Sequence, residues 1–385
     1  MPEVQTQTIQ PDVAFVRELM NNGGDSLKKC FQCGNCSVVC NISPDNQPFP
    51  RKEMIWAQWG LKDKLVANAD IWLCHNCNDC STHCPRGAKP GDVMAAIRNT
   101  SFARLAGFEF MGTLLQSPVK LPLLFAVPAI LIAVVIAMAS KKDFLSIQPI
   151  VFSNMMPVSA IDFVFLPAVG FAVIAAIMGA KKFWNEMSRS TPDRSSASGS
   201  FFQAATAVLV GILKHEKLAK CETNAPRFKS HLFTMYGFIM LFITTNIVAA
   251  MYYLTKFGIA DFVQTPLPLS HPVKILGNLG AIFAVTGVTL IVHRRYAFAR
   301  KDVGKSSYYD NHFIFILYGT ILTGILAELI RLGEATGLAF AIYYIHLILV
   351  FVLLVYGPFS KFAHIIYRFL AMTYSKMIER DRARS

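Results

Sequence analysis

The chain has 385 residues, of which 54% are hydrophobic, and its formal net charge at pH 7 is +13. This composition is too apolar for an ordinary soluble enzyme and indicates that much of the chain lies in lipid. The positive charge does not indicate nucleic-acid binding, because the basic residues lie in a few loops that contain no recognisable binding motif.

Residues 1 to about 110 are polar and mixed in composition, which predicts a soluble head domain. The chain starts without a basic segment followed by an apolar run, so we expect no secretory signal and place the head in the cytoplasm. Eight of the nine cysteines lie in the head, between Cys30 and Cys84. In a reducing compartment, clustered cysteines are more often metal ligands than disulfides.

These eight cysteines form two runs with the same spacing, C-x2-C-x2-C-x3-C. The spacing is typical of proteins with two [4Fe-4S] clusters, in which the fourth cysteine of each run binds the other cluster. The predicted ligands are Cys30, Cys33, Cys36 and Cys84 for the first cluster and Cys74, Cys77, Cys80 and Cys40 for the second. Structural zinc is the alternative, although zinc sites usually use pairs of C-x2-C.

Six charge-poor stretches follow, each close to the roughly 20 residues that a helix needs to cross a bilayer. They lie at about 121–140, 163–180, 231–255, 275–293, 311–330 and 337–360. The alternate loops and the tail are rich in Lys and Arg, which places both termini in the cytoplasm and the protein in the inner (cytoplasmic) membrane. We predict a mainly α fold, with a ferredoxin-type head at 1–110 and a membrane domain at 111–385.

The stretch from Phe201 to Leu213 is apolar but too short to span a bilayer. It is expected to form a helix that lies at the membrane interface or packs against the head.

Histidines in the membrane domain indicate function, because an ionisable side chain is costly there. Haem with two histidine ligands needs imidazoles at similar depth on different helices. His231 and His364 lie toward the cytoplasm and are the predicted ligands of an inner haem, whereas His346 and His271 are predicted for an outer one. Since 18 residues make five helical turns, a continuous last helix would present His346 and His364 on one face.

Several of these polar residues have a second interpretation. His312 is either an alternative inner haem ligand or an interfacial residue, and His271 either binds haem or lines a quinone pocket with Glu328 and Arg331. His215 and His293 are interpreted as residues that bond a neighbouring carbonyl or lie at the headgroup layer.

The segment 345–365, IHLILVFVLLVYGPFSKFAHI, resembles the last helix of the gamma subunit of respiratory nitrate reductase, including the PFS-x3-H ending and both haem histidines. The head is similar to the C subunit of heterodisulfide reductase. Over nearly its whole length, the chain resembles membrane subunits of the quinone-interacting membrane-bound oxidoreductase complexes of sulfate respiration. It departs from the nitrate reductase family in the third predicted span, where that family has a second haem histidine about ten residues from the first. Here the span has only His231, with Thr244, Thr245 and Asn246 near the second position.

The resemblance implies a cytochrome b domain with one or two haems b, and electron exchange with menaquinol or menaquinone. It also implies flavin-containing partners similar to the A and B subunits of heterodisulfide reductase, and electron flow that involves adenylylsulfate reductase. We therefore predict a membrane electron-transfer subunit that is part of an oxidoreductase and is not catalytic alone. The alternatives are a haem-free anchor for a ferredoxin module and, with less support, a transporter with a redox sensor, since no repeated architecture is evident.

Overall fold

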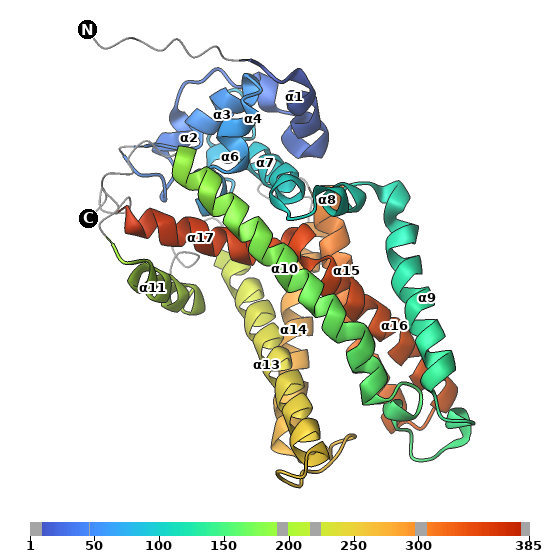
Figure 1. The fold of residues 1–385 in the computed structure, drawn as a ribbon. Coiled ribbons are helices and arrows are strands. Elements are labelled where there is room, and N and C mark those ends of the chain that lie inside the picture. Colours follow the sequence, from blue (N-terminus) through green and yellow to red (C-terminus); the bar gives the residue numbers. More distant parts are fainter. Residues whose placement is uncertain (1–9, 46, 191–198, 216–224, 297–305, 379–385) are drawn as a thin grey trace.

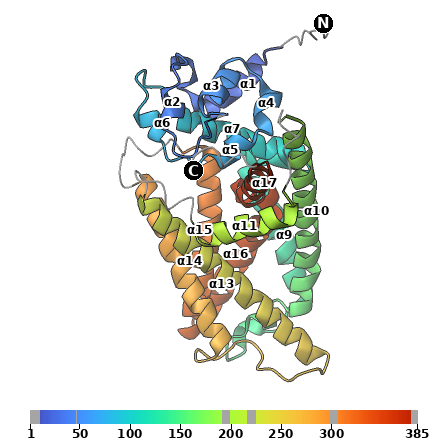
Figure 2. The same cartoon turned by 90° about the vertical axis from the view of Figure 1, so that its left-hand side faces the viewer.

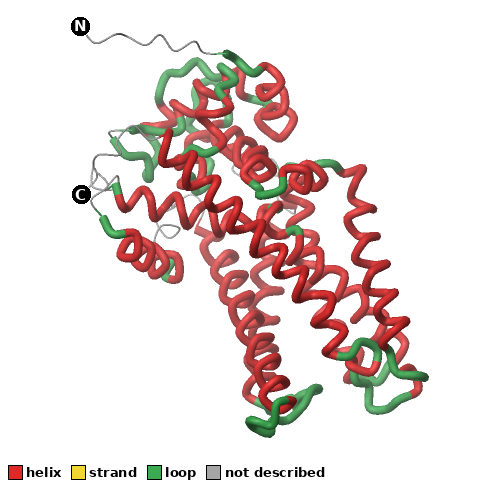
Figure 3. The backbone as a smooth tube through the Cα atoms, in the orientation of Figure 1, coloured by secondary structure: helices red, strands yellow, loops and turns green. Residues whose placement is uncertain are grey.

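The computed structural model describes residues 10–45, 47–190, 199–215, 225–296 and 306–378. Within these ranges the chain forms helices and turns and contains no strand (Figure 3). The predicted mainly α fold is therefore confirmed. The head lies at one end of the molecule and the long helices extend away from it, which defines a head side and a far side (Figure 1).

Short helices build the head and its junction with the long helices. They are α1 (Val13–Leu19), α2 (Asn35–Val38), α3 (Arg51–Gln58), α4 (Lys62–Val66), α5 (Ala69–Leu73), α6 (Asp79–Thr82), α7 (Pro90–Leu105) and α8 (Glu109–Leu115). Most of α7 is buried, because it packs against α1, α4 and α5 and also against α10. The predicted domain boundary near residue 110 falls inside α8, and the division into two domains stays a prediction.

Among the described residues, six helices are long and apolar enough to cross a membrane, which agrees with the predicted number and indicates a multi-pass membrane protein. They are α9 (Leu121–Ala139), α10 (Val158–Ser190), α13 (Ala225–Lys256), α14 (Pro272–Tyr296), α15 (Tyr308–Leu332) and α16 (Thr336–Val355). α10 is longer than the apolar stretch predicted at 163–180, because the helix begins at Val158 and continues past Lys181 and Lys182 toward the head.

The last predicted span is broken. α16 ends at Val355, and α17 (His364–Met377) begins in a new direction after two single turns (Figure 1). The prediction that His346 and His364 lie on one continuous helix is therefore wrong. Pro358 is the physical reason, because it has no backbone N–H to donate and its ring clashes with the preceding turn of a helix.

Two helices lie across the long helices on the head side. In Figure 2, α17 is seen end-on and α11 (Phe201–Leu213) runs crosswise, while the long helices run down the view. The predicted helix at 201–213 is present, and it packs against α17. Its crosswise direction fits an apolar helix that lies at a membrane surface.

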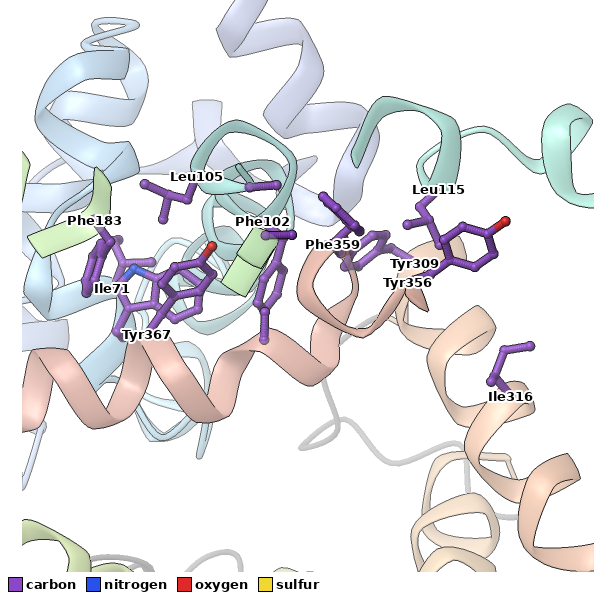
Figure 4. Packing of buried hydrophobic residues seen from close by; sticks show 14 of the residues in the cluster. Ile71, Phe102, Leu105, Leu115, Phe183, Tyr309, Ile316, Tyr356, Phe359 and Tyr367 are labelled. Carbon is purple, nitrogen blue, oxygen red and sulfur yellow. The ribbon is translucent and has the colours of Figure 1, made fainter. Parts of the chain in front are cut away.

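One hydrophobic core joins the head to the long helices (Figure 4). The indole of Trp72, on α5, is 1% exposed. Its ring centroid lies 5.1 Å from that of Phe102 on α7, 5.8 Å from Phe183 on α10 and 4.9 Å from Tyr367 on α17. Because each ring comes from a different helix, this aromatic cluster fixes the head to the rest of the molecule.

Candidate metal centres

The two cysteine runs adopt the same local backbone. Gln32 (φ 62°) and Gly34 (φ 89°) are left-handed in the first run, and Asn76 (φ 52°) and Asn78 (φ 70°) are left-handed in the second. These residues occupy equivalent places, one before and one after the second cysteine of each run. Residues other than glycine rarely adopt this conformation. Its repetition at equivalent places indicates that each loop folds around a centre of the same kind.

A backbone N–H group points at the first sulfur of each run. Gln32 N donates to Cys30 Sγ and Asn76 N donates to Cys74 Sγ, both at 3.4 Å. Hydrogen bonds to sulfur are one means by which a protein sets the reduction potential of an iron-sulfur cluster. The matching bonds therefore suit two centres of the same kind.

A cavity in the head collects the predicted ligands of the first cluster. Its lining includes the residues Cys30, Cys33, Cys36 and Cys84. Three of these come from the first run and Cys84 comes from the second. The fold thus brings the fourth cysteine of one run to the other run, as crossed ligation requires.

The second set adjoins the first. Cys80 interacts electrostatically with Cys74 of its own run and with Cys40 of the first run, and also with Cys36. Cys77, the fourth predicted ligand, is half-buried in the same loop. All eight of these cysteines are free thiols.

Burial changes the chemistry of these thiols. It raises the pKa of Cys36 to about 11, and burial together with neighbouring thiols raises the pKa of Cys30 and Cys80. Because the thiolate is the form that binds metal, a buried set needs positive charge at its centre, which iron supplies. Four sulfur donors around a common cavity fit a [4Fe-4S] cluster.

His231 on α13 and His364 at the start of α17 lie within electrostatic range of each other. The Nδ1 atom of His364 lies 2.7 Å from the carbonyl oxygen of Lys361, and Nδ1 of His231 lies 2.9 Å from Nε2 of His215. A metal-binding histidine usually engages one ring nitrogen in such a bond, which leaves the other free for the metal. The two Nε2 atoms are therefore suited to the iron of an inner haem.

His215 is a residue whose role sequence reasoning missed. Its Nδ1 atom lies 3.3 Å from the carbonyl oxygen of Leu213, as the interpretation of a carbonyl partner expects. Its Nε2 atom, however, contacts His231, and the side chain is only 5% exposed. Its left-handed backbone, with φ of 55°, comes just after α11 and was not evident from the sequence.

Residues in the first turn of α15 contact the segment between α16 and α17, which precedes His364. The hydroxyl of Tyr309 donates to the carbonyl oxygen of Phe359, and the ammonium of Lys361 pairs with the carboxylate of Asp310. These contacts fix the two single turns between α16 and α17. The orientation of His364 therefore depends on α15 as well as on its own helix.

His346 lies against α15 at a close approach. Its Nδ1 atom is 3.1 Å from the carbonyl oxygen of Thr320 and 3.1 Å from the hydroxyl of Thr323, so Nε2 is again the nitrogen suited to a metal. A side-chain Cβ at Gly324 would lie 3.0 Å from the imidazole. Glycine at this place therefore makes room for the ring.

The predicted outer partner of His346 lies at a different depth. His346 is ten residues from Thr336, the first residue of α16, so it lies ~15 Å from the far end of that helix. His271 precedes α14, at its far end, where its Nδ1 atom accepts from Val273 N at 3.3 Å. The pairing of His346 with His271 around an outer haem stays a prediction. His312 is buried on α15, with its ring centroid 6.0 Å from that of Tyr308.

Glu328 has partners that were not predicted. Its carboxylate lies 2.7 Å from the ammonium of Lys274, and the amide of Asn278 donates to it at 3.5 Å. This ion pair joins α14 to α15 toward the far side. The structure therefore places Glu328 with Lys274, and the proposed grouping with His271 and Arg331 stays a prediction.

Two families of known proteins match different parts of the chain. Residues 26–88 match the family described as 4Fe-4S dicluster domain, and residues 112–385 match the family described as Citrate utilization protein B. No solved structure matches the chain.

Relatives of the head belong to heterodisulfide reductases. The C subunit of the H(2):CoB-CoM heterodisulfide,ferredoxin reductase of Methanothermobacter marburgensis is 39% identical over 98 residues, which are 25% of this chain and 51% of that protein. A protein of Archaeoglobus profundus that is described as like the C subunit of heterodisulfide reductase is 36% identical over 85 residues, 22% of this chain and 44% of that protein. The chain thus spans about half the length of these relatives.

Another relative matches the head and the long helices together. Citrate utilization protein B of Escherichia coli is 26% identical over 356 residues, which are 89% of this chain and 88% of that protein. The head is thus an iron-sulfur module like the C subunit of heterodisulfide reductase, and the chain as a whole belongs to the citrate utilization protein B family.

Proposed function

We propose that the chain is a membrane electron-transfer subunit that carries two [4Fe-4S] clusters in the head and haem b in the membrane domain. It exchanges electrons between menaquinol or menaquinone and soluble partners. The observation that carries the proposal is that His231 of α13 and His364 of α17 interact with each other, while both helices also bond to the cysteine-rich head of the heterodisulfide reductase type through Arg227 and Arg368. Haem held by two imidazoles supplies reversible one-electron transfer.

Each group of residues has a defined task in this proposal. The crossed cysteine sets hold the two clusters next to each other, as the electrostatic interaction between Cys80 and Cys36 supports. His231 and His364 hold the inner haem, while His346 is the residue best placed for a second one. We assign the quinone to the far side, where Glu328 and Lys274 can exchange protons with it.

The partners follow from the relatives of the head. As a module of this type, the head would deliver electrons to flavin- and iron-sulfur-containing proteins similar to the A and B subunits of heterodisulfide reductase, with adenylylsulfate reductase as the further acceptor in sulfate respiration. A second candidate rests on the relative that covers most of the chain. The name of that protein links it to citrate utilization. On this basis, the soluble partner of the chain would be an oxidoreductase that acts on a tricarboxylic acid.

Two measurements on the intact protein test this proposal. Metal and haem analysis should find about eight irons in clusters plus one or two in haem. Addition of a menaquinol analogue should then reduce the haem and the clusters in membranes. A protein that contains clusters but shows no b-type absorption would be a haem-free anchor, and zinc in place of iron would overturn the assignment of the head.

Purification with its natural partners separates the two candidates for the soluble partner, which accepts electrons from this chain in the first case and supplies them in the second. A complex that contains proteins like the A and B subunits of heterodisulfide reductase supports the first candidate. A single flavoprotein that oxidises a tricarboxylate supports the second.

A further inference from the structure

The loop of the second cysteine run is held by a helix that also carries a proposed haem ligand. Arg227, near the start of α13, donates from Nη1 to the carbonyl oxygen of His75 at 2.5 Å and to that of Asn76 at 2.9 Å. These two residues lie between the first and second cysteines of the run. A guanidinium that bridges two consecutive carbonyls fixes the path of the loop between those ligands.

Two further arginines reach the same loop from other helices. Arg98 of α7 and Arg368 of α17 donate to the carbonyl oxygen of Cys74 at 3.2 Å and 3.3 Å. Three helices that are far apart in the sequence therefore each send one guanidinium to the residues Cys74 to Asn76. We call these three arginines the arginine clamp.

On two helices, a clamp arginine and a proposed haem ligand are separated by the same number of residues. Arg227 is four residues from His231 on α13, and Arg368 is four residues from His364 on α17. Residues four apart lie on the same face of a helix, ~6 Å apart along its axis. On both helices one face therefore presents a clamp arginine to the cysteine loop and a proposed haem ligand one turn away.

The first cysteine loop has a different environment. Its described arginine contacts come from the head itself: Arg51 Nε donates to the carbonyl oxygen of Gln32 at 2.9 Å, and the guanidinium of Arg86 lies 3.9 Å from the ring centroid of Phe31. Cys33 is exposed, and Phe31 is 66% exposed. The first loop thus faces the surroundings, while the second faces the long helices.

We propose that this asymmetry sets the order of the centres, and that the arginine clamp is a positioning device for one electron-transfer step. The second cluster site exchanges single electrons with the haem proposed at the inner histidine pair. In each step, one of the two sites loses the electron that the other gains. The first cluster site exchanges electrons with the soluble partner. This inference rests on the proposed function and adds the order of the centres to it.

The clamp acts on the second cluster in two ways. Its hydrogen bonds hold the loop against α13 and α17, which keeps the distance between the two redox sites constant. Its positive charges favour the reduced form of a cluster, because reduction adds a negative charge. Loss of a clamp charge therefore lowers the potential of the second cluster and leaves that of the first nearly unchanged.

The test is an EPR-monitored redox titration of the intact protein in detergent, with Arg227→Gln and Arg227→Lys compared with the unchanged protein. Arg227→Gln should lower one of the two cluster potentials and slow reduction of the clusters by quinol. Arg227→Lys keeps the positive charge, so the potential of the cluster should stay close to that of the unchanged protein, even where the loop is held less firmly.

Arg86→Gln is the matched control, since it removes an arginine beside the first loop. It should lower the other cluster potential. The proposal is overturned if Arg227→Gln and Arg86→Gln shift the same cluster, or if Arg227→Gln shifts neither while iron and haem contents are complete. Where Arg227→Gln does not assemble, Arg368→Gln tests the same clamp from α17.

Failure of the clamp can be distinguished from failure of the proposed function. Cluster potentials are read from the head even in a protein that has no haem, so the comparison of the two variants still assigns the clamped cluster. Absence of haem from the unchanged protein would instead remove the inner histidine site, and with it the proposed electron-transfer step.

Discussion

The Nε2 atom of His215 lies 2.9 Å from the Nδ1 atom of His231, so two helices joined by a connection that includes residues 216–224 share one imidazole pair. With His215 Nδ1–H directed at a carbonyl oxygen, its Nε2 accepts from His231. The hydrogen bond then makes His231 a more electron-rich ligand. The end of α11 is thereby connected to the proposed inner haem site.

Removal of this acceptor should weaken haem binding. We expect His215→Phe to lower haem affinity by about 10- to 100-fold and to raise the haem midpoint potential, because a less basic ligand stabilises ferric iron less. A spectroelectrochemical titration measures the potential. His215→Gln provides an acceptor and should restore the original value; an unchanged potential in His215→Phe would contradict this role.

Removal of a ligand should have a larger effect. His364→Ala should abolish the b-type absorption assigned to the inner haem in a reduced-minus-oxidised spectrum and block reduction of the clusters by quinol. His293→Ala is the control, because His293 is not a proposed ligand. A His364→Ala protein that retains full absorption and quinol-driven reduction would exclude the assignment.

Crossed ligation predicts an effect on both clusters from a single change. Cys84→Ala should reduce the iron content well below the expected value of about eight per protein and should disturb the EPR signals of both clusters, since Cys84 joins the two runs. Cys221→Ser should leave iron content unchanged, because Cys221 belongs to neither run. An intact second cluster in Cys84→Ala would argue against the crossed arrangement.

The aromatic cluster should contribute strongly to stability. Trp72→Ala removes a fully buried indole and should destabilise the protein by ~3–5 kcal/mol. Thermal unfolding, followed through the visible absorption of the clusters, measures the effect. Trp59→Ala is the matched control, because Trp59 is 52% exposed and its loss should cost less than about 1 kcal/mol. Equal costs for the two changes would contradict the role of the shared core.

Stability of the head should depend on pH through Glu53. Burial, followed by the negative charge of Asp70, raises the pKa of Glu53 to about 8. Because the folded pKa lies above the unfolded one, the stabilisation from the protonated form is complete below about pH 4 and is lost as the pH rises through about 8. The melting temperature should fall over this range.

The amide variant checks this pH dependence. Glu53→Gln cannot ionise, so its melting temperature should fall less steeply between pH 5 and 9 than that of the unchanged protein. The melting curves of both proteins need to be recorded over the same pH series. Parallel curves would show that another group causes the dependence.

The number of long apolar helices was predictable because hydropathy over some 20 residues is a local property. The break at Pro358 also had a local signal, since proline ends a helix. That signal was outweighed by the 18-residue spacing between His346 and His364, and the inference of one continuous helix was wrong. Their candidate roles as ligands do not depend on that helix.

The contacts among distant residues were not predictable. Nothing in the spacing of Arg227 and Arg368 indicates that both reach the carbonyls near Cys74, because the chain must first fold α13 and α17 beneath the head. The same holds for His215 and Lys274, which gain their partners only through helix packing. The cysteine grouping was easier, since the two runs have a regular spacing.

The core around Trp72 bears on how electrons leave the protein. Because its rings come from the head and from two helices outside it, α10 and α17, the head cannot detach and travel to a distant acceptor as a tethered shuttle does. In the proposed function, electrons would cross a fixed contact between the long helices and the head. Internal transfer should therefore proceed at the same speed in viscous solvents.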